Sequence, residues 1–188
     1  IVMKEVAAGE FTVLGFYDRR IRRIFPALFL VIAASTCVAL LLLLPVELMD
    51  FAQSGIATVF FVSNLYFLAT TDYFNVAAER APLLHTWSLA VEEQFYIFFP
   101  LLLMLLGRIR RLSRAIALTS IALLSFVFSL WLVRVHQSAA FYVVLARAWE
   151  LLAGALLGLN ILPRLSNRFL REILAAGGVA LIALACIY

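Results

Sequence analysis

The sequence is poor in the residues that form disulfides, metal sites and water-soluble surfaces. It holds two cysteines, two histidines and only 14% charged residues in 188 positions. Cys37 and Cys186 both lie within apolar runs, which favours small buried residues over a disulfide or a metal site. No internal repeat, low-complexity tract or signal peptide is visible. We therefore expect no metal cofactor.

Apolar residues are in large excess. They make up 65% of the chain, and the mean hydropathy is +1.06, whereas soluble chains are about half apolar. A net charge of +4 can suggest nucleic acid, but the arginines stand in short clusters between apolar runs, a pattern typical of membrane topology. The composition excludes an ordinary soluble domain and predicts a multi-pass membrane protein that contacts lipids and binds no nucleic acid.

Five apolar runs are long enough to cross a bilayer as helices, for which roughly 20 residues are needed. They are residues 25–44, 87–106, 115–133, 141–159 and a last run that begins near residue 173. The segment 51–84 is also apolar but is dotted with polar side chains. If it crossed the membrane too, the arginine clusters at 19–23 and 108–114 would lie on opposite sides, against the positive-inside rule.

A re-entrant segment over residues 51–84, which enters and leaves the membrane at one face, removes this conflict. Twelve of the fifteen basic residues then lie in the cytoplasm. Backbone that breaks a helix at membrane depth is tolerated where it lines a cavity, which suits the polar side chains of this segment. We predict an all-α, polytopic transmembrane helical bundle with five full spans and one re-entrant segment, located in the cell (inner) membrane.

The head of the run 87–106 carries a polar stripe. His85, Ser88, Glu92 and Tyr96 follow helical steps of three, four and four, so they share one face. Ionised groups in hydrocarbon cost at least a few kcal/mol and usually serve a function. Glu93 lies about 100° from this stripe, so we select Glu92 as a buried proton handler or charge partner. A hydrolase-like serine triad lacks the strained turn and oxyanion hole that it needs.

Two further charged pairs stand at helical spacing. Arg20 and Arg23 place two guanidiniums on one helical face, either as a fork for phosphate groups or as a plain topology signal. Arg147 and Glu150 lie within the run 141–159, where each charge needs a partner. They pair with each other as a structural ion pair, face a substrate, or use a glutamate of the run 87–106.

Four segments in fixed order resemble one known family. They are 16–27 (FYDRRIRRIFPA), 61–64 (FVSN), 82–96 (PLLHTWSLAVEEQFY) and 147–152 (RAWELL). Together they resemble the acyltransferase family 3 membrane enzymes, of the O-antigen and peptidoglycan O-acetyltransferase type. The resemblance covers nearly the whole chain, and four ordered motifs make it much more specific than any one of them alone.

This resemblance implies transfer of an acyl group, mostly acetyl, from acetyl-CoA in the cytoplasm to a hydroxyl of a surface glycan or glycolipid. It places Arg20 and Arg23 on the family's donor-associated Arg-x-x-Arg and Glu92 on the glutamate before its Phe-Tyr pair. Residues that we expect to be substrate-binding or structural are His85, Trp87, Ser88, Tyr96, Arg147 and Glu150.

The chain departs from the family at its N-terminus. The family opens with two membrane helices, the first with a catalytic histidine, and neither His85 nor His136 matches that position. We therefore expect residues 1–188 to be a partial domain of a roughly ten-span protein, without the first two and the C-terminal helices, and inactive alone. The alternative class is a proton-coupled transporter, since buried charges and a re-entrant segment are also typical of carriers.

Overall fold

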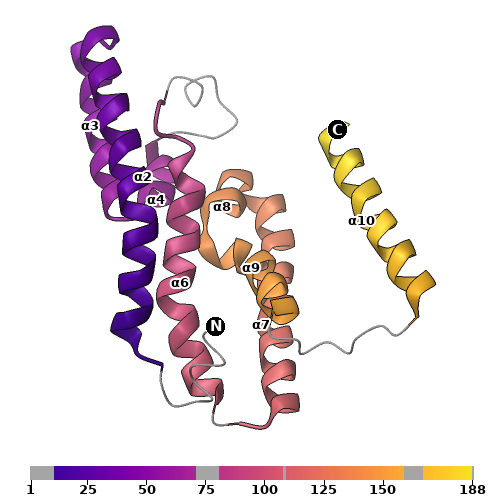
Figure 1. Cartoon of the computed structure of the whole chain (residues 1–188). Coiled ribbons are helices and arrows are strands. Elements are labelled where there is room, and N and C mark those ends of the chain that lie inside the picture. The colour runs from indigo at the N-terminus through magenta and orange to yellow at the C-terminus, as the bar shows by residue number, and fades with distance from the viewer. Residues whose placement is uncertain (1–10, 71–80, 108, 159–166, 188) are drawn as a thin grey trace.

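The computed structural model describes residues 11–70, 81–107, 109–158 and 167–187, which form eight α-helices and, within these ranges, no strand (Figure 1). The helices are α2 (Val13–Leu42), α3 (Pro45–Val59), α4 (Ser63–Thr70), α6 (Thr86–Gly107), α7 (Arg111–Val135), α8 (Gln137–Tyr142), α9 (Val144–Gly158) and α10 (Arg168–Ile187). The predicted all-α class is confirmed. Lys4, Arg108, Arg164 and residues 71–80 of the predicted re-entrant segment lie outside the described residues.

Four helical stretches have the length and hydropathy to cross a membrane. They are Val13–Leu42, Thr86–Gly107, Leu112–Val135 and Gln137–Gly158. The last combines α8 and α9, which are separated at Val143 by one residue in an extended conformation. The multi-pass prediction is confirmed by these stretches. The fifth run forms α10 but is not among the four, so five full crossings stay a prediction.

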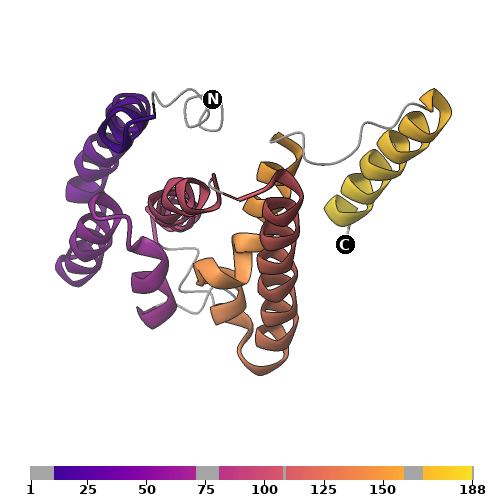
Figure 2. The same cartoon turned by 90° about the horizontal axis from the view of Figure 1, so that it is seen from below.

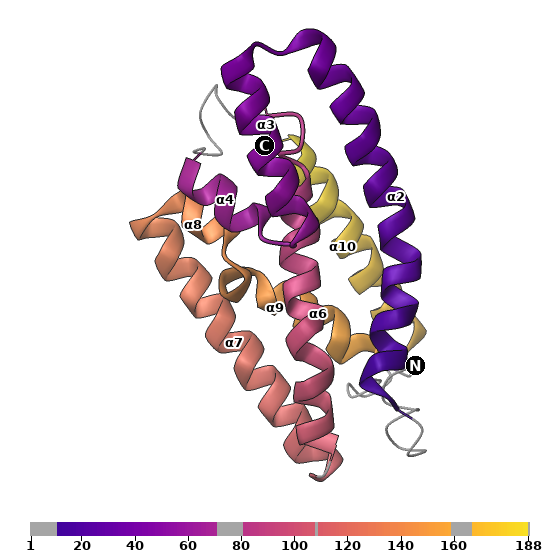
Figure 3. The same ribbon diagram turned by 90° about the vertical axis from the view of Figure 1, so that its left-hand side faces the viewer.

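The described part of the predicted re-entrant segment, residues 51–70 and 81–84, contains most of α3 and all of α4, and its re-entry stays a prediction. Helix α3 turns back beside α2, and the 8-residue α4 follows a sharp bend (Figure 3). At 15 residues α3 is about 22 Å long, too short to cross a bilayer core of about 30 Å. Helices α2 and α6 run antiparallel (Figure 1). The start of α2 and the end of α6 therefore lie at the same end of the bundle, although Arg20 lies beside Glu93 in the first third of α6.

Local sequence explains where α3 begins and ends. Pro45 is its first residue, where a missing N–H costs no helical hydrogen bond. The backbone N–H of Leu44 donates to Glu47 Oε2 at 3.0 Å, which satisfies one of the free amides of the first turn. At the other end Phe61 has φ 53°, a left-handed conformation that costs a bulky residue free energy and ends the helix.

Polar side chains supply hydrogen bonds to the backbone at this break between α3 and α4. The side-chain amide of Gln94 on α6 donates to the Phe61 carbonyl and to Asn64 Oδ1, both at 2.8 Å. The Asn64 amide donates in turn to the Tyr142 carbonyl at the end of α8, at 3.0 Å. Asn64 is fully buried. This amide clamp of Asn64 and Gln94 explains how irregular backbone is tolerated within the bundle.

A hydroxyl pair joins the same segments. Thr58 Oγ1 on α3 lies 2.9 Å from Thr86 Oγ1 at the start of α6, and Ser63 Oγ donates to the Thr86 carbonyl at 3.0 Å. All three residues are buried. Polar side chains within residues 51–84 therefore form hydrogen bonds that join α3, α4 and α6. Hydrogen bonds between helices stabilise packing in a membrane.

Apolar packing occupies both ends of α6. One cluster comprises Ala39, Phe51, Phe67, Leu83 and Tyr142 near the start of α6. A second comprises Phe95, Leu103, Leu118, Leu152 and Leu156, between α6, α7 and α9. Seen from below, α6 lies between the α2–α4 group and the α7–α9 group (Figure 2). Helix α10 stands apart, and its described side chains, residues 168–184, are exposed (Figure 1).

Candidate functional site on two sides of α6

The side of α6 that faces α2 holds an arginine between a carboxylate and an aromatic ring. Arg20 Nη2 lies 2.6 Å from Glu93 Oε1, and Arg20 Nε donates to Glu93 Oε2 at 3.3 Å. The guanidinium carbon stands 3.4 Å from the centroid of the Tyr96 ring. The side chains of Arg20 and Glu93 are 22% and 11% exposed. This is a bidentate, largely desolvated ion pair with an added cation–π contact.

The two arginines of the predicted phosphate fork, Arg20 and Arg23, lie in different surroundings. Arg20 is held by Glu93 and Tyr96, whereas Arg23 is exposed and makes no ion pair with any residue in the described ranges. Arg22 pairs with Asp18 on the surface of α2, at 2.9 Å. The two guanidiniums of the Arg-x-x-Arg spacing therefore do not form one open fork, because a helical step of three turns Arg23 away from α6.

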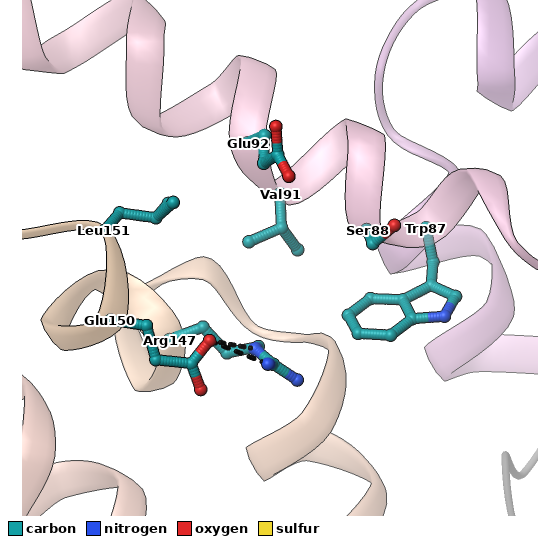
Figure 4. A pocket seen from close by; sticks show the side chains of 7 residues that line it. All are labelled: Trp87, Ser88, Val91, Glu92, Arg147, Glu150 and Leu151. Carbon is teal, nitrogen blue, oxygen red and sulfur yellow. Dashed lines mark hydrogen bonds and ion pairs between the residues drawn. The ribbon is translucent and has the colours of Figure 1, made fainter. Parts of the chain in front are cut away.

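The other side of α6 forms one wall of an open pocket with α9. Figure 4 shows its lining, which consists of Trp87, Ser88, Val91, Glu92, Arg147, Glu150 and Leu151. Its volume is about 80 Å³, well below the roughly 300–1,000 Å³ of pockets that bury a whole drug-sized ligand. Of the residues that the sequence places in a functional set, Trp87, Ser88, Glu92, Arg147 and Glu150 come together here.

Only part of the predicted polar stripe of α6 is exposed. His85, which precedes the helix in a turn, Ser88 and Glu92 are exposed, while Tyr96 is half-buried under Arg20 of α2. Ser88 Oγ donates to the His85 carbonyl at 3.2 Å. Glu92 has no hydrogen bond or ion pair within the described part of the chain. The expectation of a buried Glu92 is wrong here, because the burial that was assigned to it belongs to Glu93.

Arg147 and Glu150 pair with each other. Arg147 Nη2 and Nε donate to Glu150 Oε2 at 2.7 and 3.2 Å. The Arg147 guanidinium carbon also lies 5.3 Å from the Trp87 ring centroid and 5.4 Å from that of Phe141. Of the three partners that the sequence left open, the structure selects the local one. Both bonds end on Glu150 Oε2, so its Oε1 has no hydrogen bond within the described residues (Figure 4).

A serine of α7 interrupts α9 beside this ion pair. Ser125 Oγ accepts from the Trp149 N–H at 2.9 Å and donates to the Leu145 carbonyl at 2.6 Å. In a regular helix these two backbone groups, four residues apart, bond to each other. A side chain inserted into the ladder bends a helix. Ser125 therefore determines the local course of α9 where Arg147 and Glu150 project into the pocket.

Sequence reasoning missed three of these residues. Glu93 was set aside because it lies off the polar stripe, although it stands seven residues after Thr86 and so shares that residue's face. Gln94 gave no signal of its own, since its partners at residues 61 and 64 come from a helix break. Ser125 is one of several hydroxyls in α7, and only the position of α9 distinguishes it. Among the described residues, no group of three or more potential metal ligands gathers.

Comparison with known proteins identifies the family. The acyltransferase 3 family, described as an acyltransferase domain, matches residues 7–188. An uncharacterized protein of Haemophilus influenzae is 34% identical over 175 residues, which are 89% of this chain and 71% of that protein. No solved structure matches.

Two relatives carry functional names. The O-acetyltransferase OatA of Staphylococcus aureus is 34% identical over 151 residues, 77% of this chain and 24% of the relative. The "Putative membrane-bound transacylase BcsY" of Komagataeibacter xylinus is 30% identical over 180 residues, 95% of this chain and 46% of the relative. The chain thus spans less than half the length of either. With a family match over nearly all of its residues, this multi-pass membrane chain belongs to the acyltransferase 3 family.

Proposed function

We propose that the protein moves an acetyl or other short acyl group from acyl-CoA to a hydroxyl of a cell-surface glycan or glycolipid. The observation that carries this proposal is the contrast between the two sides of α6. Arg23 is an exposed, unpaired cation beside the Arg20–Glu93 pair, and Glu92 is an exposed, unpaired carboxylate on the pocket side, each within the described residues. The names of the relatives OatA and BcsY support acyl transfer.

The arginine side suits the donor. CoA is polyanionic, and guanidinium groups bind phosphates through charge-assisted hydrogen bonds. Arg23 is free for such a bond, whereas Arg20 keeps its guanidinium on Glu93 and Tyr96 and thereby fixes α2 against α6. In the proposed site Arg23 binds donor phosphate directly, and Arg20 holds the helix that presents it.

Glu92 suits a role in the transfer step. A carboxylate with no partner within the described residues, on a helix long and apolar enough to cross the membrane, is available to orient a hydroxyl or to balance developing positive charge. Neither His85 nor His136 occupies the position of the family's histidine. We therefore assign to Glu92 the positioning of charge, and the removal of the hydroxyl proton to neither of these two histidines.

The test is transfer of labelled acetyl from acetyl-CoA to the surface-glycan fraction, in membranes that carry the intact protein. Arg23→Ala is compared with Arg23→Lys and with Arg168→Ala, an exposed helical arginine of α10. Loss of one charge-assisted bond costs about 1.5–3 kcal/mol, or roughly 10- to 100-fold. We expect Arg23→Ala to raise the KM for acetyl-CoA by that factor, Arg23→Lys by less, and Arg168→Ala by less than twofold.

Two results contradict this proposal. An unchanged KM in Arg23→Ala removes Arg23 from the donor site. Wild-type membranes that transfer no acetyl, although the protein is inserted and folded, refute the acyltransferase function proposed for these substrates. Proton-coupled uptake of a solute by such membranes then favours the transporter.

A further inference from the structure

We propose that the pocket between α6 and α9 is the acceptor site, and that it selects a neutral, hydroxyl-rich group such as a sugar ring over any phosphate-bearing group. This inference rests on the proposed acyl transfer and assigns one of its two substrates to a place in the fold. The pocket is lined from both helices by Ser88 and Glu92 on one side and by Arg147 and Glu150 on the other (Figure 4).

Free hydrogen-bonding capacity in the pocket includes both acceptors and donors. Both oxygens of Glu92 and the Oε1 of Glu150 have no partner among the described residues, since both bonds from Arg147 go to Glu150 Oε2. A carboxylate only accepts hydrogen bonds, and the other N–H groups of the Arg147 guanidinium only donate them. The best ligand therefore brings donors and acceptors together, as the hydroxyl groups of a sugar do. A phosphate dianion or a thioester brings acceptors alone.

The charge of the pocket points to the same class of ligand. Glu92 and Glu150 carry two negative charges and Arg147 one positive charge, so the lining has a net charge of −1 when all three are ionised. Like charges brought together in a site of lowered dielectric repel strongly. A CoA phosphate is therefore disfavoured here, while a neutral polyol meets no such penalty.

The apolar part of the lining limits what fits. Trp87, Val91 and Leu151 supply flat or aliphatic walls between the polar groups, the mixture that ligand sites use to combine contact area with orientation. A volume of about 80 Å³ admits the hydroxyl-bearing edge of a ring and excludes an extended nucleotide, because pockets that bury a whole drug-sized ligand hold roughly 300–1,000 Å³.

The pocket and the arginines of α2 lie at the same level along α6. Arg20 contacts Glu93, which directly follows Glu92 of the pocket lining. A helical step of about 100° separates the two glutamates. The pocket therefore lies beside the proposed donor side, on another face of the same helix.

A pocket-filling variant tests this assignment in the intact protein. Leu151→Trp adds bulk inside the pocket, and Leu157→Trp adds the same bulk to an exposed position of the same helix. We expect Leu151→Trp to lower transfer of labelled acetyl to the glycan fraction at least tenfold while the Kd for labelled acetyl-CoA changes less than twofold. Leu157→Trp should change neither. Ser88→Leu, at an exposed position of the pocket, serves as a second filling variant if Leu151→Trp does not fold.

Two outcomes overturn the acceptor assignment. A tenfold rise in the acetyl-CoA Kd of the filled variant makes the pocket a donor site. Unchanged transfer in a folded, filled variant shows that the pocket takes no part. Either result leaves the proposed function intact if the wild type transfers acetyl. Failure of the proposed function is recognised separately, by a wild type without transfer.

Simple sugars test the chemical class without any mutation. In wild-type membranes, glucose should inhibit transfer competitively with the glycan acceptor, and glucose 6-phosphate should inhibit competitively with acetyl-CoA. The reason is that the neutral sugar suits the carboxylate-lined pocket and the phosphate suits the arginines. Glucose that does not inhibit at 100-fold the concentration of the glycan acceptor, or glucose 6-phosphate that competes with the acceptor more strongly, overturns the class proposed here.

Discussion

Glu92 and Glu93 are neighbours in the chain, but they lie in different surroundings. Glu93 is buried against α2 in a bidentate pair with Arg20, whereas Glu92 is exposed on the pocket side and has no ion pair within the described residues. A helical step of about 100° separates them. One carboxylate therefore stabilises the contact between helices, and the adjacent one stays available to a ligand.

The two arginine–glutamate pairs differ in a related way. Arg20 is bound by a residue of another helix, while Arg147 is bound by a residue of its own helix and borders the pocket. Glu93 uses both oxygens on Arg20 and is 11% exposed, whereas Glu150 uses one oxygen on Arg147 and is 41% exposed. The pair that joins distant segments therefore serves the fold, and the local pair leaves hydrogen-bonding capacity for a ligand. Four predictions test this comparison.

The largest expected effect is the loss of the pair between α2 and α6. Glu93→Gln leaves the Arg20 guanidinium without its counter-charge, and breaking a buried pair costs roughly 3 kcal/mol. We expect the free energy of unfolding in mild detergent to fall by about that amount. The control is Asp18→Asn, which breaks the exposed pair with Arg22 and should cost about 0.5 kcal/mol. Equal losses in the two variants would contradict the structural role of Glu93.

The second prediction concerns the neighbouring carboxylate. Glu92→Gln should lower the rate of acetyl transfer about a hundredfold, equivalent to about 2.7 kcal/mol of activation free energy. Its unfolding free energy should stay within about 0.5 kcal/mol of wild type, because exposed positions without partners contribute little. The measurements are labelled transfer and thermal unfolding of one purified sample. A Glu92→Gln variant that loses stability and keeps the wild-type rate would show that Glu92 supports the fold and not the transfer step.

The third prediction concerns the amide clamp that closes the break between α3 and α4. Gln94→Leu leaves the Phe61 carbonyl and the Asn64 side chain with fewer partners. An unsatisfied buried polar group costs about 1–3 kcal/mol, so we expect a loss of about 2 kcal/mol in unfolding free energy. Gln53→Leu, at an exposed position of α3, is the matched control. The clamp is refuted as a stabilising feature if both variants unfold alike.

The smallest effect is expected at the bend of α9. In Ser125→Ala the Trp149 N–H regains the Leu145 carbonyl directly, so the loss is limited to one contact between helices, about 0.6 kcal/mol on average in membrane proteins. Ser129→Ala, a half-buried serine on the same helix, should leave the unfolding free energy unchanged. Thermal unfolding of both variants in one detergent measures the difference. A stabilised Ser125→Ala would show that the bend is strained.

The ends of a helix were predicted well where the apolar run and the helix have the same ends, and less well where the helix continues beyond the run or is interrupted within it. The run 87–106 became α6 (Thr86–Gly107) and the run 115–133 became the core of α7 (Arg111–Val135). The run 25–44 marked only the apolar part of α2, which begins at Val13 because the basic, amphipathic residues before it continue the same helix. The run 141–159 concealed the extended residue Val143 between α8 and α9.

The site was predicted in part for a similar reason. The stripe His85, Ser88 and Glu92 proved to share one face of α6, since helical periodicity is a local property. Its orientation was misjudged, because periodicity shows which residues lie together and not what lies opposite them. The pairing of Arg147 with Glu150 was among the partners considered, and a spacing of three made it possible without any other helix.

The sequence by itself determined that this is an all-helical membrane protein of the acyltransferase 3 family, with a polar face on the helix that carries Glu92 and Glu93. Hydropathy, charge clusters and spacing are properties of short segments, and they need no knowledge of neighbours. Only the tertiary structure decided that Glu93 receives Arg20 from 73 residues away, and that Glu92 and Arg23 stay open. Those outcomes depend on which helix packs against which face, and packing is a property of the whole chain.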